Sequence, residues 1–331
     1  MRRALITGIT GQDGRHLSEH LLEQGYEVFG VLRGQHNPKR AIVEREVPDV
    51  RLVEGDLTDQ VSLISAVQTV QPDDVYNLGA MSFVALSWNQ PELTGNVTGL
   101  GALRMLEAIR IVQGSTASRS GGPGIRFYQA SSSEMFGAAE EVPQHELTRF
   151  HPRSPYGVAK VFAHHMTINY RESYGMFACS GILFNHEGWR RGPEFVTRKI
   201  SRAAARIKLG RQDKLTLGNL ESKRDWGYAG DYVQAMHLML QQDRPDDYVI
   251  GTGECFSVRD FAEAAFRCVG LNWEAYVTLD SSLLRPAEVD ILQADPAKAR
   301  KVLGWQPKVT FAGLVELMVE SDLKIESALA T

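Results

Sequence analysis

The sequence predicts an α/β fold, a doubly wound parallel sheet with a smaller C-terminal α+β domain. Two observations carry this prediction: short apolar runs alternate with amphipathic helical stretches as far as residue 184, and the alternation weakens beyond it. Such alternation favours a parallel sheet with helices on both faces. The 331 residues are enough for two unequal domains, which we expect over residues 1–184 and 185–331, with segments of the second crossing back to the first.

The first domain is expected to begin with a strand over residues 4–7 and a helix that carries Leu17, Leu21 and Leu22 on one face. Gly25 is a typical helix stop. The same reasoning predicts further strands over residues 26–32, 51–53, 75–78, 125–129 and 177–183. It predicts further helices around residues 61–67, 99–109 and 154–174.

The second domain shows isolated elements instead of a regular alternation. We expect a strand over residues 214–217 and helices over 231–241, 258–269 and 311–322, and we assign all of them to the smaller domain. Residues 114–124 are rich in serine and glycine and are expected to form a surface loop.

Composition excludes several classes of function. A formal charge of −4 offers no footprint for nucleic acid. Three cysteines are too few and too scattered for a disulfide framework or a metal cage. No apolar run reaches the roughly 18 residues that span a membrane. We therefore expect a cytoplasmic protein with no metal, no membrane partner and no nucleic-acid partner.

The turn after the first strand, Gly8-Ile9-Thr10-Gly11-Gln12-Asp13-Gly14, has GxxGxxG spacing. Glycines there allow a tight turn and let the backbone approach a phosphate, while the helix that follows presents free N–H groups to it. A turn with no ligand is the alternative. The position between the first strand and the first helix favours a Rossmann-type site for the pyrophosphate of a dinucleotide.

The end of the second strand distinguishes NAD from NADP. An acidic residue there would bind the ribose hydroxyls of NAD, whereas this chain has Arg33, whose guanidinium suits the 2′-phosphate of NADP. The alternative is a solvated surface arginine. Asp56 follows the third strand and is expected to accept a hydrogen bond from the adenine amino group.

Two groups of residues suggest catalysis. Tyr156 and Lys160 stand four apart on one helical face, so the lysine charge is expected to lower the pKa of the tyrosine and make it a base. Ser132 and Glu134 lie at the carboxyl end of the fifth strand, where sites of open α/β sheets occur. A serine-rich helix cap is the alternative for that pair.

With these residues in place, the chain resembles the extended short-chain dehydrogenases/reductases and, among them, the GDP-mannose 4,6-dehydratase family. The similar stretches run nearly from end to end: LITGITGQDG (5–14), YNLGAMSFVALSWNQP (76–91), FYQASSSEMFG (127–137), PRSPYGVAK (152–160), NYRESYGMFACSGILFNHE (169–187), FVTRKI (195–200), KRDWGYAGDYVQAMHLMLQQ (223–242) and RPAEVDIL (285–292).

The resemblance implies an NADP-dependent reaction on a GDP-hexose. Carbon 4 is oxidised, Glu134 removes the proton of carbon 5, water leaves from carbon 6, and hydride returns to carbon 6. The implied catalytic residues are Ser132, Glu134, Tyr156 and Lys160. The implied cofactor contacts are Gly8, Thr10, Gly11, Gln12, Asp13, Gly14, Arg33, Asp56, Leu57, Leu78, Ala80, Tyr156 and Lys160. The implied substrate contacts are Ser82, Asn185, Glu187, Lys199, Arg224, Arg285 and Glu288.

Several positions depart from the family pattern. Ser132 stands where the family usually has threonine, Met81 replaces a glutamine, and Gly188-Trp189 replaces Ser-Pro. Met81 and Trp189 are expected near the sugar and point to an altered hexose. Only Arg33 remains of two adjacent arginines that help to build a tetramer in the family, so we expect either a homodimer or a homotetramer.

Two alternatives remain open. One is a GDP-sugar epimerase that passes through a 4-keto intermediate on a modified or longer sugar and returns hydride to carbon 4. The other is a non-catalytic nucleotide sensor, against which the joint presence of Glu134, Tyr156 and Lys160 argues.

Overall fold

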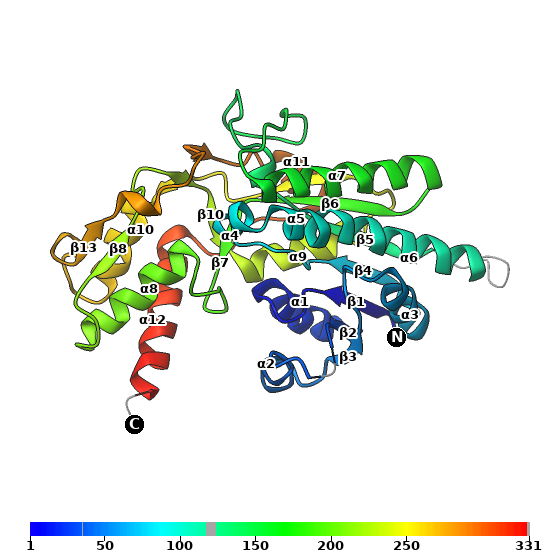
Figure 1. The fold of residues 1–331 in the computed structure, drawn as a ribbon, viewed down its shortest axis with the longest axis horizontal. Helices are drawn as coiled ribbons and strands as arrows, with labels where there is room; N and C mark the ends of the chain where they lie inside the picture. The colour runs from blue at the N-terminus through cyan, green and yellow to red at the C-terminus, as the bar shows by residue number, and fades with distance from the viewer. Residues whose placement is uncertain (35, 117–123, 330–331) are drawn as a thin grey trace.

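A computed structural model describes residues 1–34, 36–116 and 124–329, and its centre is a seven-stranded sheet (Figure 1). The strands are β1 (Arg3–Thr7), β2 (Glu27–Leu32), β3 (Arg51–Glu54), β4 (Asp74–Asn77), β5 (Arg126–Ser132), β6 (Ala178–Leu183) and β11 (Asp247–Ile250). They are all parallel, in the order β11-β6-β5-β4-β1-β2-β3. The order reverses between β1 and β4, the point at which doubly wound sheets bind ligands.

Helices cover both faces of this sheet. One face holds α1 (Gln12–Glu23), α2 (Arg40–Glu46), α9 (Ala229–Leu240) and α11 (Ala297–Leu303). The other holds α3 (Gln60–Val70), α6 (Gly101–Thr116) and α7 (Pro155–Tyr174), with α4 (Val84–Asn89), α5 (Pro91–Thr94) and the π-helical turn η1 (Gly95–Leu100) leading into α6. Two apolar layers result, and the predicted Rossmann-type fold is confirmed.

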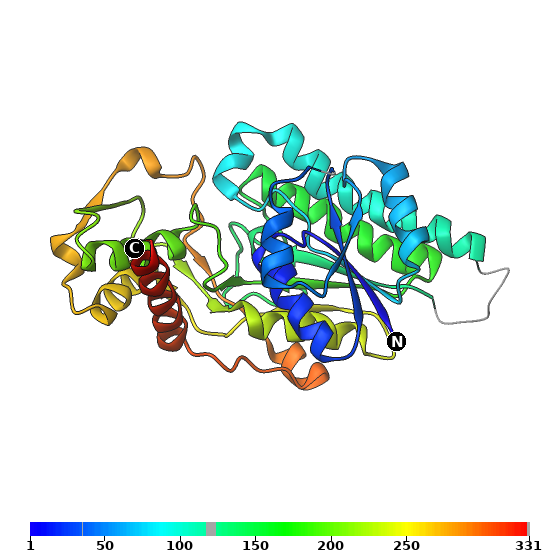
Figure 2. The ribbon, with the colours of Figure 1, turned by 90° about the horizontal axis from the view of Figure 1, so that it is seen from below.

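A second unit lies beside one end of the sheet and has its own apolar core (Figure 2). Its helices are α8 (Val196–Lys208), α10 (Val258–Cys268) and α12 (Phe311–Ala328). Short strands pair within it: β7 (Asn185–Glu187) with β10 (Trp226–Tyr228), β8 (Leu215–Leu217) with β13 (Val277–Leu279), and β9 (Lys223–Arg224) with β12 (Phe256–Ser257) and β14 (Ile291–Leu292). The remaining short turns of helix are η2 (Ser133–Met135), η3 (Trp273–Ala275) and η4 (Ser281–Leu283).

The predicted helix over 231–241 exists as α9, but its assignment to the smaller unit is wrong. The buried side chains of α9, among them Tyr232, Met236 and Leu240, pack with Leu17 and Leu21 of α1 in the core of the main sheet. β11 then extends that sheet beside β6. The apolar residues of α9 pack on the face formed by β5 and β6. The position of α9 in the chain, after β7, does not reveal which core these residues join.

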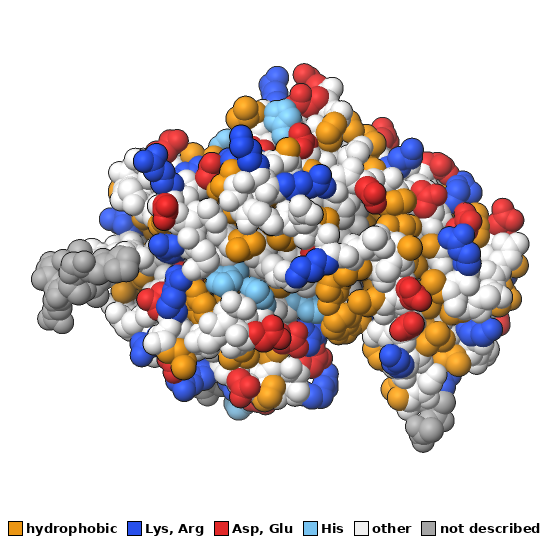
Figure 3. Space-filling view, turned by 180° about the vertical axis from the view of Figure 1, so that it is seen from behind, with side chains coloured by type: hydrophobic (Ala, Val, Ile, Leu, Met, Phe, Trp, Pro, Cys, Tyr) orange, Lys and Arg blue, Asp and Glu red, His pale blue; other side chains and the backbone are white. Residues whose placement is uncertain are grey.

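Other differences concern short elements and one loop. The expected strand over 214–217 exists as β8, whereas α8 and the other short strands of the second unit were not predicted. Strands of two or three residues are too brief to show a period. Residues 117–123 of the expected loop over 114–124 lie outside the described residues. In the space-filling view a notch separates part of the second unit from the body of the molecule (Figure 3). Among the described residues, no helix is long and apolar enough to cross a membrane.

Candidate active site

The glycine turn forms a cradle at the reversal point of the sheet. Gly8 has φ +73°, and a Cβ on it would lie 2.8 Å from the backbone nitrogen of Gly79, in the loop after β4. A Cβ on Gly14 would lie 2.5 Å from the oxygen of Gly8. The turn therefore tolerates only glycine at both positions, and it leads into α1 with Gly11 as N-cap and no side chain capping the helix. Backbone N–H groups that lack side-chain caps suit a pyrophosphate, so these residues fit a dinucleotide.

A row of hydrogen bonds joins the carboxyl ends of β1 and β4 to the middle of β5. Thr7 Oγ1 donates to Asn77 Oδ1 at 2.7 Å and accepts from the N–H of Gly79 at 3.0 Å. Asn77 Nδ2 donates to Gln129 Oε1 at 2.8 Å. These three buried polar side chains fix the loop that follows β4 against the glycine turn. Sequence reasoning missed them, although polar residues at the ends of buried strands were visible as a signal.

The other expected cofactor residues lie at the same edge of the sheet. Arg33 is exposed directly after β2, and Asp56, directly after β3, uses Oδ1 to accept from the N–H and hydroxyl of Thr58, both at 2.8 Å. Leu57 lies against Gly79: a Cβ added to that glycine would be 2.7 Å from Leu57 Cδ1. The remaining members lie in the turns after β1 and β4; they are Thr10, Leu78 and Ala80. Ser82, expected as a substrate contact, is exposed in the loop after β4.

Tyr156 and Lys160 lie in the first turns of α7, whose N-terminus is capped by Ser154 Oγ. Both side chains are buried, and Lys160 Nζ donates to Ala130 O at 2.6 Å. Lys160 Nζ is 5.7 Å from the centre of the Tyr156 ring. The expected lowering of the Tyr156 pKa is wrong: burial raises it to about 12, although a hydrogen bond with Ser132 acts in the opposite direction. Burial also lowers the pKa of Lys160 to about 8.

Glu134 lies in η2, directly after β5, and is 8% exposed. Its Oε1 is 3.4 Å from Arg285 Nη1, and its N–H donates to Ser132 Oγ at 3.2 Å. Arg285 in turn donates its N–H to Glu288 Oε1 at 2.8 Å. Burial lowers the pKa of Arg224, and the carboxylates of Glu134 and Glu288 oppose that shift. The structure thus brings Ser132, Glu134, Arg224 and two residues of the loop before β14 together.

Glu187 is a buried carboxylate with two partners inside the protein. It is 2% exposed, and its Oε2 accepts from Thr197 Oγ1 at 2.7 Å and lies 2.9 Å from Arg191 Nε. Asn185 is half-buried in β7, opposite Trp226, and Lys199 is half-buried on α8 near Asp280. The carboxylate of Glu187 thus ties β7 to Thr197 of α8, and its role as a substrate contact stays a prediction.

Arg191 is a functional candidate that sequence reasoning did not assign. Its guanidinium lies 3.6 Å from the centre of the Phe195 ring, and its charge lowers the pKa of Tyr156, against the larger effect of burial. Arg191, which follows the Asn-His-Glu segment, is thus a cation that acts on Tyr156. The signal in the sequence that could have found Arg191 is its position four residues after Glu187, with which it pairs.

Two departures from the family pattern, Trp189 and Met81, make contacts within the protein. Trp189 packs against α1, with its ring 5.1 Å from that of His16 and 5.7 Å from that of Tyr228. The N–H of Met81 donates to Thr98 Oγ1 at 3.1 Å. The ring of Trp189 therefore contacts α1 through His16, and its expected place near the sugar stays a prediction.

Solved structures with this architecture act on sugar nucleotides. UDP-glucose 4-epimerase from Thermus thermophilus, in complex with NAD, matches 97% of this chain and 98% of its own, with a TM-score of 0.82 and 27% identity. The dTDP-glucose 4,6-dehydratase DesIV from Streptomyces venezuelae matches 98% of both chains with a TM-score of 0.83, and at 22% identity it shares the fold. The arrangement of sheet, glycine turn and Tyr-Lys helix defines an extended short-chain dehydrogenase/reductase, an enzyme class that uses a nicotinamide cofactor.

Sequence comparison narrows this class to one family. A family model described as GDP-mannose 4,6 dehydratase matches residues 5–318. GDP-mannose 4,6 dehydratase 2 from Arabidopsis thaliana is 52% identical over 330 residues, with 97% of this chain and 87% of the relative covered. The human GDP-mannose 4,6 dehydratase is 46% identical, with 97% and 91% covered. The chain belongs to the GDP-mannose 4,6-dehydratase family.

Proposed function

We propose that this protein catalyses the NADP-dependent 4,6-dehydration of GDP-mannose to GDP-4-keto-6-deoxymannose. Membership of the dehydratase family supports the reaction, and one observation of the site carries it. Glu134 is a buried carboxylate beside Ser132 and Tyr156, so a base for carbon 5 lies next to the pair that serves carbon 4. An epimerase needs Ser132 and Tyr156 for the chemistry at carbon 4, but it needs no base for carbon 5.

Each step uses a side chain already in position. Tyr156 takes the hydroxyl proton of carbon 4, and Ser132 holds that oxygen by a hydrogen bond. When bound, a nicotinamide would supply the acceptor for hydride from carbon 4 and the donor of hydride to carbon 6. Glu134 removes the proton of carbon 5, made acidic by the new ketone, and passes it to the hydroxyl of carbon 6, which leaves as water. Tyr156 gives carbon 5 the proton that it took from the carbon 4 hydroxyl when carbon 6 is reduced. Lys160, fixed on Ala130 O, adds positive charge near the phenol.

The sugar nucleotide is assigned mainly to residues 185–331, and the cofactor to residues 1–184. Arg224, Arg285 and Lys199 supply cations for the diphosphate, and Glu288 suits the ribose hydroxyls. Asn185 and Ser82 are assigned to the hexose. Because Arg285 lies against Glu134, the diphosphate site and the proton-abstracting carboxylate share one wall.

The choice of NADP over NAD is assigned to Arg33. Replacing Arg33 by alanine is expected to weaken NADP⁺ binding about tenfold, the order of a lost charge-assisted contact with phosphate, and to leave NAD⁺ binding nearly unchanged. Titration calorimetry with both dinucleotides measures this. Arg45→Ala, an exposed arginine on α2, is the matched control. Equal weakening of both dinucleotides would show that Arg33 does not contact the 2′-phosphate.

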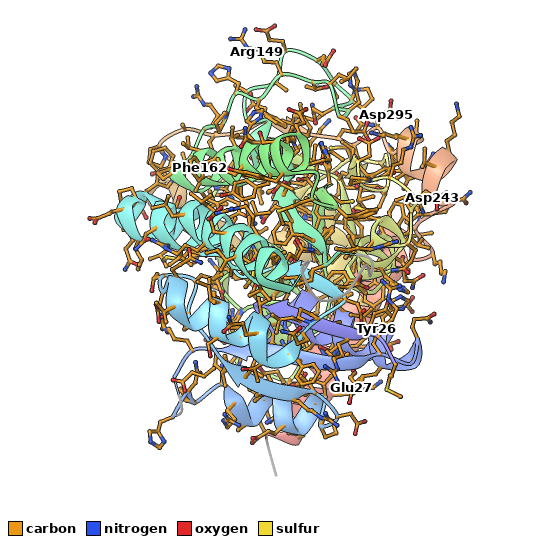
Figure 4. The ribbon with its side chains drawn as sticks, turned by 90° about the vertical axis from the view of Figure 1, so that its right-hand side faces the viewer. Tyr26, Glu27, Arg149, Phe162, Asp243 and Asp295 are labelled. Atoms are coloured by element: carbon orange, nitrogen blue, oxygen red, sulfur yellow. The ribbon has the colours of Figure 1, made fainter. Side chains whose placement is uncertain are left out.

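We also assign a homo-oligomeric state, with an apolar groove between η1 and α7 as one contact. The groove is lined in part by Leu100, Val158 and Phe162, which are 41%, 56% and 39% exposed. Phe162 is labelled on α7 in Figure 4. Apolar side chains of this size on one helical surface are typical of subunit interfaces. Light scattering of the purified protein gives the number of subunits.

Product analysis tests the reaction itself. The protein with NADP⁺ and GDP-mannose is expected to give a nucleotide sugar lighter by one water, with a 4-keto group that hydrazine reagents detect. A nucleotide sugar of unchanged mass and altered configuration would establish an epimerase. Tightly held dinucleotide with no turnover of any GDP-sugar would leave only a sensor.

A further inference from the structure

His186 makes two hydrogen bonds that together fix its charge. Its Nδ1 is 2.7 Å from the carbonyl oxygen of Phe184, and its Nε2 is 2.9 Å from Asp13 Oδ2. A carbonyl oxygen and a carboxylate can only accept, so both ring nitrogens must donate. An imidazole with two N–H groups is a cation. The geometry therefore requires His186 to be protonated.

The groups that face His186 agree with this charge. Burial acts to lower the pKa of His186, but the carboxylate of Asp13 raises it above its ordinary value, against the cation of Arg191. The pKa of Asp13 lies well below its usual range: burial would raise it, and His186 and Arg191 outweigh that effect. From α9, the ring of Tyr232 stacks on His186 with centres 4.8 Å apart.

The ion pair stands at the end of α1 that the glycine turn opens. Asp13 is in the first turn of α1, where a carboxylate suits the helix but repels an anionic ligand. Gln12 Nε2 donates to Asp13 Oδ1 at 3.1 Å and to His186 O at 3.0 Å, so α1 and β7 are held together at this point. Asp13 was expected to contact the cofactor, yet its carboxylate is engaged by His186.

The charge of Asp13 also reaches the catalytic helix. After burial, which dominates both shifts, Asp13 is among the groups that raise the pKa of Tyr156 and of Lys160. Asp13 raises the pKa of Tyr156, and a positive charge on His186, in contact with the Asp13 carboxylate, opposes that increase. The pair thus links the dinucleotide turn, the substrate-bearing strand β7 and the phenol.

We propose that His186 is a positioning residue that remains an imidazolium and neutralises Asp13, so that the pyrophosphate of the cofactor can bind at the N-terminus of α1. The proposal rests on the dinucleotide-dependent function proposed above. It assigns no proton transfer to His186: the ring stays charged throughout the reaction and acts through Asp13.

Nuclear magnetic resonance tests the charge without any turnover. In protein labelled with ¹⁵N-histidine, one ring is expected to show two N–H groups at neutral pH, and His186→Gln identifies it by loss of its signals. His165→Gln, an exposed position on α7, is the matched control. A spectrum in which His186 has one bare ring nitrogen at neutral pH would overturn the proposal.

Measurements of NADP⁺ binding test whether the charge of His186 helps the cofactor to bind. His186→Gln is expected to weaken NADP⁺ binding by on the order of tenfold, because the unpaired Asp13 charge remains near the pyrophosphate. The double variant Asp13→Asn/His186→Gln has no charge at the pair and is expected to return to within about threefold of the unchanged protein. A purely structural pair would make the double variant as weak as the single one, and that result would overturn the proposal.

The pH dependence of sugar oxidation tests the coupling between Asp13 and Tyr156. In His186→Gln the rate of sugar oxidation is expected to rise at a higher pH than in the unchanged protein, since the Asp13 charge disfavours the phenolate of Tyr156. An unshifted profile would contradict the assigned coupling. Failure of the unchanged protein to bind either dinucleotide would overturn the proposed function as well, whereas a neutral His186 in a protein that binds NADP⁺ overturns only this inference.

Discussion

Replacing Glu134 by glutamine is expected to abolish the elimination of water while leaving the sugar able to bind. Glutamine keeps the size of the side chain but has no basic oxygen for the carbon 5 proton. General base catalysis contributes about 10²–10⁴-fold, so the rate of dehydration is expected to fall by that factor. Reduced nicotinamide should build up when GDP-mannose is added, because carbon 4 is oxidised and the next step is blocked. Absorbance of the reduced cofactor and mass spectrometry of the sugar measure the two steps.

Glu140→Gln is the matched control for this variant. Glu140 is exposed in the same loop after β5, so its loss is expected to leave dehydration within twofold. Undiminished dehydration by Glu134→Gln would remove Glu134 from the reaction. Loss of sugar binding would instead assign its main task to holding Arg285, its neighbour at 3.4 Å.

Replacing Tyr156 by phenylalanine is expected to stop the reaction one step earlier. The variant lacks the oxygen that takes the carbon 4 proton, so reduction of the cofactor by GDP-mannose should fall about 10²–10⁴-fold. In the unchanged protein this step should speed up as pH rises, because a phenol whose pKa is raised to about 12 is protonated at neutral pH. The residual rate of the variant should not show that rise. Single-turnover measurements across pH give both results.

Tyr174→Phe serves as the comparison on the same helix. Tyr174 ends α7 and is 54% exposed, so loss of its hydroxyl is expected to leave the rate and its pH dependence unchanged. If the rate of cofactor reduction by Tyr156→Phe still rose with pH as in the unchanged protein, a group other than Tyr156 would be responsible for that rise. Lys160, whose pKa burial lowers to about 8, is the first to examine.

The sequence alone predicts the sheet and the main helices of the first unit well. Strands such as β1, β5 and β6 are short apolar runs between helical stretches, and each lies within three residues of its expected bounds. The glycine turn was recognisable because its spacing reflects a steric need, seen in the contact of Gly8 with Gly79. Patterns that arise from local geometry can be read from local sequence.

Roles that depend on distant partners could not be predicted. Asp13 and Glu187 both stand in motifs that suggest ligand contacts, yet their carboxylates are engaged by His186 and by Arg191. Likewise the pKa of Tyr156 depends on how deeply it is buried, and a spacing of four residues from Lys160 contains no such information. The contact of Trp189 with His16 could not be predicted for the same reason, since it joins residues far apart in the chain.

The return of the chain to the main sheet has a consequence for how the protein holds together. After β7 and β10 in the second unit, α9 and β11 complete the first, and α11 does so again after β14. A fragment that stops at residue 184 would leave the edge of β6 unpaired and strip the cover from Leu17 and Leu21. Residues 1–184 are therefore not an autonomous module that could be excised, exchanged or inherited on its own, because segments from the later part of the chain complete their sheet and core.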